Sequence, residues 1–331
     1  MLLLIGISNL IVIYIGGKQY MDGQIENLGT IAEFIIYVNM LTWPVASIGW
    51  VTSLIQEAEA SQKRINEFLK QTPGITNTNE LESKIEGAIT FKNVHFKYED
   101  TNIEALKGIS FEVQKGQTLA IIGNTGSGKS TILELIGRLY DVQKGQIEVD
   151  GETIKNLNLN SLRSSIGFVP QDPFLFSDSL RNNIKFGKNK ASDEEVIEAS
   201  KMAVVHDNIT NFKNGYDTVL GERGITLSGG QKQRISIARA FIKNPQILLL
   251  DDCLSAVDTE TEEQILNNIE LVTKGKTTII VSHRISSAKN ADIIVVLNNG
   301  IITQQGSHVQ LINVEGYYKE LYQNQLREIS S

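Results

Sequence analysis

The sequence predicts an α/β fold with a parallel core sheet, preceded by two long apolar helices. Three short apolar runs, residues 119–122, 247–250 and 278–281, have the length and the Ile and Leu content of strands that are buried on both faces of a parallel sheet. Two stretches near the N-terminus, residues 1–17 and 34–55, contain no charged side chain. The three apolar runs predict the parallel sheet. The two uncharged stretches predict helices that are removed from water.

The second uncharged stretch has the length of a membrane-spanning helix, which needs about 20 consecutive apolar residues. Residues 34–55 meet that length, whereas residues 1–17 lie at its lower limit. Two other interpretations of residues 1–17 are the apolar core of a signal peptide and a buried helix, but neither a positive leader nor a cleavage site is evident. Pro44 lies inside the second stretch and predicts a bend, which neighbouring membrane helices can accommodate.

The positions of lysine and arginine predict how these helices are oriented. The connector between the two stretches contains Lys18, whereas Lys63, Arg64 and Lys70 follow the second stretch. Because basic residues favour the cytoplasmic side, we expect the chain to be cytoplasmic after about residue 56. The apolar spacing of residues 56–70 predicts a helix that continues out of the membrane.

An α/β pattern follows a polar linker. Residues 71–85 are polar, contain a Pro-Gly pair and predict that linker. Alternating apolar side chains between residues 91 and 98 suggest edge strands. The Asp150-Gly151 pair lies between two short strand-like runs and predicts a hairpin turn.

Composition disfavours several classes of function. The formal net charge of the 331 residues is −7, whereas proteins that bind nucleic acid usually carry a basic face. A single cysteine, Cys253, excludes an internal disulfide framework and is typical of a reducing compartment. The four histidines show no metal-ligand spacing.

Side chains able to do chemistry follow each of the three predicted core strands. A glycine-rich loop follows the first strand, Asp251 and Asp252 follow the second, and Ser282 and His283 follow the third. Because ligands of open α/β sheets bind beyond the carboxyl ends of the strands, we expect these residues to meet in one site.

The glycine-rich loop matches the P-loop pattern G-x-x-x-x-G-K-[ST], between a predicted strand and a predicted helix. In that pattern backbone amides and the helix N-terminus face the phosphates, Lys129 reaches the β- and γ-phosphates, and the Ser130 hydroxyl binds Mg²⁺. The other interpretation, an ordinary glycine-rich turn, does not explain why lysine and two hydroxyls stand in register. The P-loop residues are Gly123, Asn124, Thr125, Gly126, Ser127, Gly128, Lys129, Ser130 and Thr131.

The aspartate pair after the second core strand is the candidate for metal binding and catalysis. Asp251 can hold the Mg²⁺ shell, and Asp252 stands where a base could polarise the attacking water. Alone, two aspartates after an apolar run could also cap a helix. Together with a P-loop, they indicate nucleotide hydrolysis.

A second glycine motif, residues 227–231, begins a helical pattern over residues 233–242 that stops at Asn244-Pro245. Ser228 is a plausible N-cap, and exposed amides at a helix start form an anion site. Taken alone, two glycines before a helix are commonplace. The motif residues are Leu227, Ser228, Gly229, Gly230 and Gln231.

With these motifs in order, the chain resembles an ATP-binding-cassette (ABC) transporter ATPase domain over about residues 86–325. Residues 227–231 match the family's signature motif, Gln171 matches the Q-loop, and His283 matches the switch histidine. Tyr98 matches the aromatic that stacks on adenine, although by itself it could equally be a strand core residue. The residues that resemble the D-loop are Ser255, Ala256, Val257 and Asp258.

The resemblance implies the chemistry and the assembly. ATP and Mg²⁺ are the expected cofactors, with Asp252, His283 and Gln171 as catalytic residues and Ser130, Gln171 and Asp251 around the metal. Two such domains would face each other head to tail. ATP would then lie between the P-loop of one domain and the signature motif of the other, which acts in trans.

Membrane spans fused ahead of the ATPase resemble exporters, because importer ATPases are usually separate chains. Residues 1–70 look like the last two of six spans of a multidrug- or lipid-exporting half-transporter, followed by the linker, the ATPase domain and a tail over residues 326–331. Two helices cannot enclose a pathway, so we expect a truncated N-terminal part: a fragment, or a gene start at an internal methionine. The expected partners are a second half-transporter and membrane lipid, but no nucleic acid. The expected location is the cell membrane, multi-pass, with the ATP-binding domain in the cytoplasm.

One residue departs from the family pattern. Most active members place glutamate directly after the first aspartate, where this chain has Asp252. Three hypotheses therefore stand. The chain is an ATP-hydrolysing exporter subunit, or a partner subunit of a heterodimeric exporter that mainly binds ATP and hydrolyses it slowly, or a soluble ABC ATPase. The third usually carries tandem cassettes or a coiled-coil insertion, and this chain shows neither.

Overall fold

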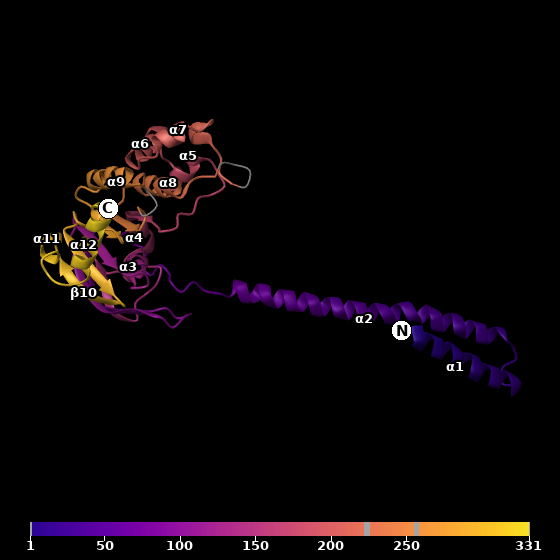
Figure 1. The fold of residues 1–331 in the computed structure, drawn as a ribbon. Coiled ribbons are helices and arrows are strands. Elements are labelled where there is room, and N and C mark those ends of the chain that lie inside the picture. The colour runs from indigo at the N-terminus through magenta and orange to yellow at the C-terminus, as the bar shows by residue number, and fades with distance from the viewer. Residues whose placement is uncertain (1, 222–225, 255–257, 331) are drawn as a thin grey trace. The chain divides into compact units, whose positions relative to one another are not determined.

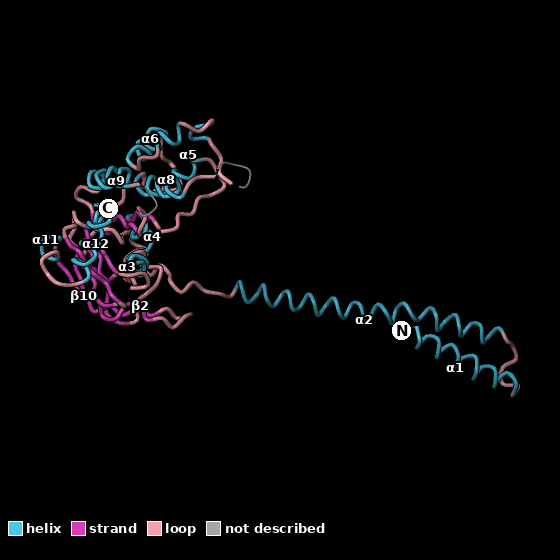
Figure 2. The backbone as a smooth tube through the Cα atoms, viewed as in Figure 1, coloured by secondary structure: helices cyan, strands magenta, loops and turns pink. Residues whose placement is uncertain are grey.

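The computed structural model describes residues 2–221, 226–254 and 258–330. The chain divides into two compact units, Met1–Pro73 and Gly74–Ser331. Strands are confined to the C-terminal unit (Figure 2). Each unit is described by itself below.

The N-terminal unit is a pair of antiparallel helices, α1 (Leu2–Met21) and α2 (Gly29–Leu69) (Figure 1). Both are long and apolar enough to be candidate membrane spans. Gly16 allows close packing, because a Cβ there would lie 3.0 Å from the Ile31 side chain. Large apolar side chains are exposed along both helices, with Trp43 77% exposed. An apolar surface of this kind is stable in lipid or against other helices, and costly in water.

The C-terminal unit contains two sheets. The antiparallel sheet has the order β2-β1-β4-β5, and the six-stranded sheet has the order β10-β9-β3-β8-β7-β6. In the larger sheet β6, β7, β8, β3 and β9 are parallel neighbours, and β10 pairs antiparallel with β9. The strands are β1 (Ile89–Lys97), β2 (Glu104–Val113), β3 (Thr118–Gly123), β4 (Lys144–Val149), β5 (Glu152–Thr153), β6 (Ile166–Val169), β7 (Ile247–Asp251), β8 (Thr277–Val281), β9 (Ile293–Asn298) and β10 (Ile301–Gly306).

Helices surround the larger sheet and form a separate helical layer. They are α3 (Lys129–Ile136), α4 (Leu159–Ser165), α5 (Leu180–Lys185), α6 (Asp193–Met202), α7 (His206–Thr210), the 3₁₀ helix η1 (Gly215–Asp217), α8 (Gly229–Phe241), α9 (Thr259–Val272), α10 (Ile285–Ala288), α11 (His308–Leu311) and α12 (Tyr317–Ser330). Among the described residues, buried apolar side chains form one cluster between the two sheets, one under α5–α9, and one under α10–α12. Strands of the larger sheet contribute side chains to all three clusters, so both of its faces are covered.

The three predicted core strands are confirmed as β3, β7 and β8. All five residues of β7 and of β8 are buried, as expected for strands covered on both faces. The predicted hairpin is also confirmed, since β4 and β5 pair around Asp150 and Gly151. Both turn residues have positive φ, +55° and +81°, which is the geometry of a type I′ turn.

The expectation of an edge strand near residue 91 was wrong. β1 lies between β2 and β4, so it is internal to the antiparallel sheet. A bulge at Asn93, with φ +47°, sets Phe91 and Val94 three residues apart on the same buried face. Alternation reports which face of a strand is buried, but it carries no information on how many neighbours the strand has.

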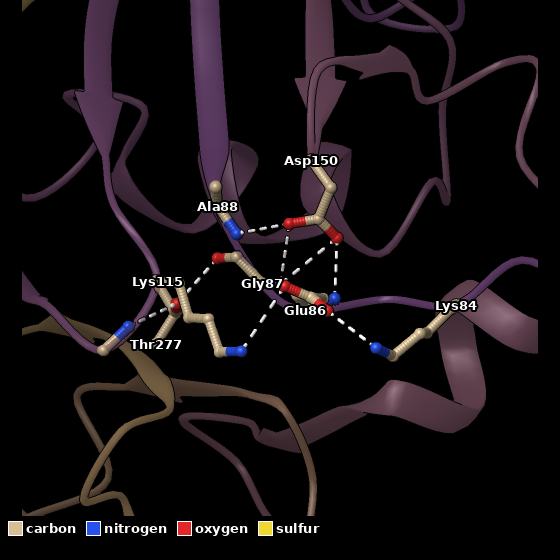
Figure 3. A network of polar contacts seen from close by, with 8 residues as sticks. Lys84, Glu86, Gly87, Ala88, Lys115, Asp150 and Thr277 are labelled. Carbon is tan, nitrogen blue, oxygen red and sulfur yellow. Dashed lines mark hydrogen bonds and ion pairs between the residues drawn. The ribbon is translucent and has the colours of Figure 1, made fainter.

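The irregular segment before β1 is fixed to the C-terminal unit (Figure 3). The Asp150 carboxylate accepts hydrogen bonds from the backbone amides of Glu86 (2.7 Å), Gly87 (2.9 Å) and Ala88 (2.8 Å). The Thr277 hydroxyl donates to the Gly87 carbonyl at 2.6 Å. Residues 86–88, directly after the predicted linker, are therefore bound within the C-terminal unit.

Helix α12 extends through most of the residues that the sequence suggests as a tail. α12 continues to Ser330, so residues 326–330 belong to this helix. Helix α8 begins at Gly229, four residues before the predicted start, because Ser228 supplies the N-cap.

Candidate nucleotide site

The carboxyl ends of β3, β8 and β7 lie side by side, in that order, in the larger sheet. The residues that follow them line one cavity of about 480 Å³. Predicted site residues on its wall are Tyr98, Thr125, Gly126, Gly128, Lys129, Ser130, Thr131, Gln171, Asp251, Asp252 and His283. The sheet order brings together motifs that lie more than a hundred residues apart in the chain.

Two glycines permit the tight path of the loop after β3. Gly123 has φ +158°, and a Cβ there would lie 2.1 Å from the Leu297 carbonyl oxygen. Gly128 has φ +99°, and a Cβ would lie 2.5 Å from the Ala105 carbonyl oxygen. Gly128 is also the N-cap of α3 and forms no side-chain cap, so the first amides of that helix are open to an anion.

Lys129 is held inside this loop. Its side chain is buried, and Nζ donates to the carbonyl oxygens of Gly123 and Asn124, both at 2.8 Å. Burial lowers the pKa of the ammonium, and the carboxylates of Asp252 and Asp251 act against that shift. A cation held among backbone carbonyls is poised to exchange them for phosphate oxygens.

Ser130 and Asp251 form a pair of hard oxygen ligands. The Ser130 hydroxyl donates to Asp251 Oδ1 at 3.1 Å. Burial raises the pKa of the Asp251 carboxyl, and the bond from Ser130 acts in the opposite direction. Oxygen ligands of this type, completed by substrate phosphates and water, fit Mg²⁺.

Asp252 has a backbone conformation that is rare outside glycine, with φ +42°. Its amide donates to the Val281 carbonyl at 2.9 Å, which ties it to the end of β8. Burial raises the pKa of its carboxyl, whereas His283, through its charge and a backbone hydrogen bond, and Lys129 lower it. The strained residue thus lies next to the switch histidine and the P-loop lysine.

Gln171 and Tyr98 reach the cavity from outside the three strand ends. Gln171 follows β6, and its carbonyl accepts a bond of 3.4 Å from Gln233 of α8. The Tyr98 hydroxyl lies 2.9 Å from Thr131 Oγ1 and donates to Glu134 Oε2 at 2.8 Å. Burial, with help from Glu134, raises the pKa of Tyr98 to about 12. The ring is therefore neutral and held by two partners on α3.

The signature residues lie elsewhere on the surface. Ser228 caps α8 in a reciprocal capping box: its hydroxyl accepts from the Gln231 amide at 3.2 Å, and Gln231 Oε1 accepts from the Ser228 amide at 3.0 Å. Leu227 is buried, whereas Ser228 and Gly229 are exposed. None of residues 227–231 lines the P-loop cavity in the described part of the chain. The motif is a formed helix start that faces solvent.

Residues 106–255 match the sequence model of the ABC transporter family. The chain contains an ABC transporter ATP-binding domain. It is 42% identical over 324 residues to a probable multidrug resistance ABC transporter ATP-binding/permease protein of Bacillus subtilis, YheI. It is 40% identical over 324 residues to the multidrug resistance-like ATP-binding protein MdlA of Escherichia coli. Each alignment covers 98% of this chain and 55% of the relative, so the chain spans about half the length of these proteins.

A solved structure supports the same assignment. The structure of a bacterial Atm1-family ABC exporter with ATP bound matches this fold with a TM-score of 0.79 and 38% sequence identity. The match covers 91% of this chain and 53% of the exporter chain. The parallel core sheet, the antiparallel sheet and the helical layer are thus the architecture of an ABC ATPase.

The residues that were predicted to form the D-loop fall mainly outside the described part of the chain, which includes Asp258 but not Ser255, Ala256 or Val257. Asp258 is the N-cap of α9, and its carboxylate accepts from the Thr261 amide at 2.9 Å. That bond lowers the pKa of Asp258. In the described chain Asp258 thus has a capping role.

Sequence reasoning missed several residues that line the cavity beside the P-loop. Glu104 and Lys107 of β2, and the Asn299-Gly300 turn between β9 and β10, also line it. The Gly300 amide donates to the Ser127 carbonyl at 3.0 Å and so supports the P-loop. An Asn-Gly pair between two apolar runs signals a hairpin, but its position against the P-loop follows only from the sheet order.

A second cavity, of about 300 Å³, lies between α3, β6, α5 and α8 of the ABC domain. Its wall is mostly apolar and includes Phe168 and Phe186, with Arg163, Arg239 and Lys243 among its polar residues. It contains none of the P-loop or aspartate residues. The predicted nucleotide-binding residues therefore line the first cavity and not this one.

Proposed function

We propose that this chain is the ATP-binding and ATP-hydrolysing subunit of an ABC exporter that moves a small molecule, drug or lipid across a membrane. The observation that carries the proposal is the cavity in which the P-loop, Asp251, Asp252 and His283 meet. The two apolar helices of the N-terminal unit and the similarity to multidrug ATP-binding/permease proteins support export rather than another use of ATP.

In this proposal each group of the cavity has a role toward MgATP. Tyr98 stacks on adenine, and the amides of residues 123–131 and Lys129 surround the phosphates. Ser130, Asp251 and Gln171 hold Mg²⁺, which neutralises charge between the phosphates when it is bound. Asp252 orients and polarises the attacking water, and His283 contacts the γ-phosphate. The 3.1 Å pair of Ser130 and Asp251 supports the metal assignment.

We further propose that a second half-transporter completes the site. The exposed α8 N-terminus carries open amides and the Ser228 hydroxyl, yet it does not line its own P-loop cavity. A helix N-terminus attracts phosphate through its amides and its dipole. A partner domain, identical or different, would place the phosphates of its bound ATP against this surface.

The substitution Gly229→Asp tests this arrangement. An aspartate in the first turn of α8 suits the helix dipole, so the domain should fold and bind ATP normally. Its carboxylate would oppose the γ-phosphate of a nucleotide held by the partner. We expect ATP affinity within about twofold of the parent, and loss of the dimer formed with ATP and Mg²⁺, measured by light scattering. Gly229→Asn is the matched neutral control. Equal dimer formation by both variants would argue against a nucleotide sandwich.

The chain is placed by this proposal in the cell membrane. Residues 1–70 would form part of a membrane domain in contact with lipid, residues 71–85 the linker, and residues 86–325 a cytoplasmic ATPase. The exposed apolar side chains of α1 and α2 support lipid contact.

Fractionation of cells that express the full chain tests the membrane assignment. We expect the chain to stay in the membrane pellet after alkaline wash and to be released only by detergent. The same chain without residues 1–70 is the control and should be recovered in the supernatant. Release of the full chain without detergent would favour the third hypothesis, a soluble ABC ATPase.

A second candidate function is favoured by one observation. Asp252 stands where most active members have glutamate, and its backbone has a φ of +42°. This fixed backbone limits how far the shorter side chain can reach toward the attacking water. The chain would then bind ATP, hydrolyse it slowly, and complete the active site of a different subunit.

A further inference from the structure

The C-terminal helix α12 contacts two of the loops that form the nucleotide cavity. Near its start, the Tyr317 hydroxyl donates to Asn124 Oδ1 of the P-loop at 3.0 Å. Further along, Gln325 Nε2 donates to the His283 carbonyl at 2.9 Å, and Gln325 Oε1 accepts from the Ile285 amide at 2.8 Å. One helix therefore touches both the phosphate-binding loop and the loop of the switch histidine.

Tyr318 anchors α12 to the sheet. It is fully buried, its hydroxyl lies 2.7 Å from His308 Nδ1, and its amide donates to Gln304 Oε1 at 3.1 Å. Its ring belongs to the apolar cluster that contains Ala120 of β3 and Ile294 of β9. Because β3 leads into the P-loop, α12 is fixed relative to the phosphates as well as to the histidine.

Gln325 clamps the backbone on both sides of Arg284. The side-chain nitrogen of Gln325 donates to the His283 carbonyl, and its side-chain oxygen accepts from the Ile285 amide. A single side chain therefore fixes three consecutive residues. Neither methionine, which lacks both polar atoms, nor asparagine, which is one methylene shorter, can form this pair of bonds. The clamp is a consequence of the length and the polarity of glutamine.

The same loop is also held by Glu262 of α9. This carboxylate is buried, pairs with the Arg284 guanidinium, and accepts bonds from the hydroxyls of Ser286 (2.8 Å) and Ser287 (2.9 Å). Gln325 therefore holds the backbone from His283 to Ile285, and Glu262 holds side chains of the residues that follow His283. Because the imidazole projects from that backbone into the cavity, the attachments determine where it points.

We propose that Gln325 is a positioning residue: it holds the loop backbone so that the His283 imidazole meets the γ-phosphate. This inference rests on the proposed function of the cavity as an ATP-hydrolysing site. It assigns to the C-terminal helix a part in turnover, although Gln325 touches neither nucleotide nor metal. ATP binding, which depends on the P-loop and Tyr98, should not need the clamp.

The test compares Gln325→Met with Gln323→Met, an exposed glutamine on the same helix, in the full chain in detergent. Loss of hydrogen bonds of this kind predicts a fall of about 3- to 10-fold in the single-turnover rate of Gln325→Met. The Kd for ATP should stay within twofold, and Gln323→Met should match the parent in both. Amide exchange in the segment around Ile285 should be faster in Gln325→Met alone.

A double-mutant cycle separates positioning from general stability. If Gln325 acts through His283, adding Gln325→Met to His283→Ala should cause no further loss of rate. Equal losses in both backgrounds, unchanged exchange, or equal changes in Kd and rate would each overturn the inference. Absence of turnover in the parent chain would instead contradict the proposed function, and amide exchange would still decide whether the clamp exists.

Discussion

Replacement of Lys129 by alanine is expected to abolish ATP turnover and to weaken ATP binding by about 10- to 100-fold. The ammonium is buried in the P-loop and bonded at 2.8 Å to two backbone carbonyls, which phosphate oxygens would replace. Charge-assisted hydrogen bonds contribute about 1.5–3 kcal/mol each. In the described part of the cavity the other lysine is Lys107, which belongs to β2 and lies outside the P-loop.

The measurement is an ATP titration of the full chain, with a thermal unfolding curve to verify folding. Lys289→Ala is the matched control, because it removes the same charge from an exposed position that does not line the cavity. We expect parental affinity for the control. An unchanged Kd for a folded Lys129→Ala chain would contradict the placement of the phosphates.

Replacement of Asp252 by glutamate is expected to raise the single-turnover hydrolysis rate by about 10- to 100-fold. A general base must lie about 2.6–3.2 Å from the proton that it takes, or act through one water. Aspartate is one methylene shorter than glutamate, and a misplacement of about 1 Å can cost about 10²-fold in rate. The intrinsic pKa values of the two carboxyls, about 3.9 and 4.3, hardly differ.

The structure adds a reason why Asp252 does not compensate for its length. Its backbone is fixed by the bond to the Val281 carbonyl and by a left-handed φ of +42°. Burial raises the pKa of its carboxyl, while His283 and Lys129 oppose that shift. The basicity of the carboxylate thus depends on its neighbours, whereas its distance to the water depends on the length of the side chain. Lengthening the side chain changes reach and keeps these neighbours.

The rate is measured in a complex whose other site carries Lys129→Ala, so that hydrolysis reports one site. Asp252→Asn is the companion variant: it keeps the length of aspartate, removes the base and should hydrolyse more slowly than the parent. ATP affinity should be similar in all three. If Asp252→Glu leaves the rate unchanged, aspartate already reaches the water, and a symmetric, fully active homodimer becomes the better hypothesis.

Local pattern was enough to predict much of this domain. The runs that became β3, β7 and β8 are short, apolar and followed by chemistry-bearing residues, because buried parallel strands need that composition and ligands bind at their carboxyl ends. Ser228 as the cap of α8 and Asp150-Gly151 as a hairpin turn follow from side-chain and backbone preferences within a few residues.

Other features needed the tertiary structure, because they join segments far apart in the chain. The internal position of β1 depends on its two neighbours, and the Asn299-Gly300 turn reaches the P-loop only because β9 lies next to β3. Tyr98 is ambiguous as a single aromatic, whereas its contacts with Thr131 and Glu134 place it at the cavity.

The sequence by itself predicted the candidate chemistry of this protein, because a lysine, two aspartates and a histidine each follow an apolar run and can be recognised from that pattern alone. Tertiary structure alone decided how those groups are held. The clamp of Gln325 on the His283 loop and the fixing of residues 86–88 by Asp150 link residues more than forty positions apart. Such contacts leave no periodic trace in the sequence, because a hydrogen bond depends on where two segments meet and not on their spacing along the chain.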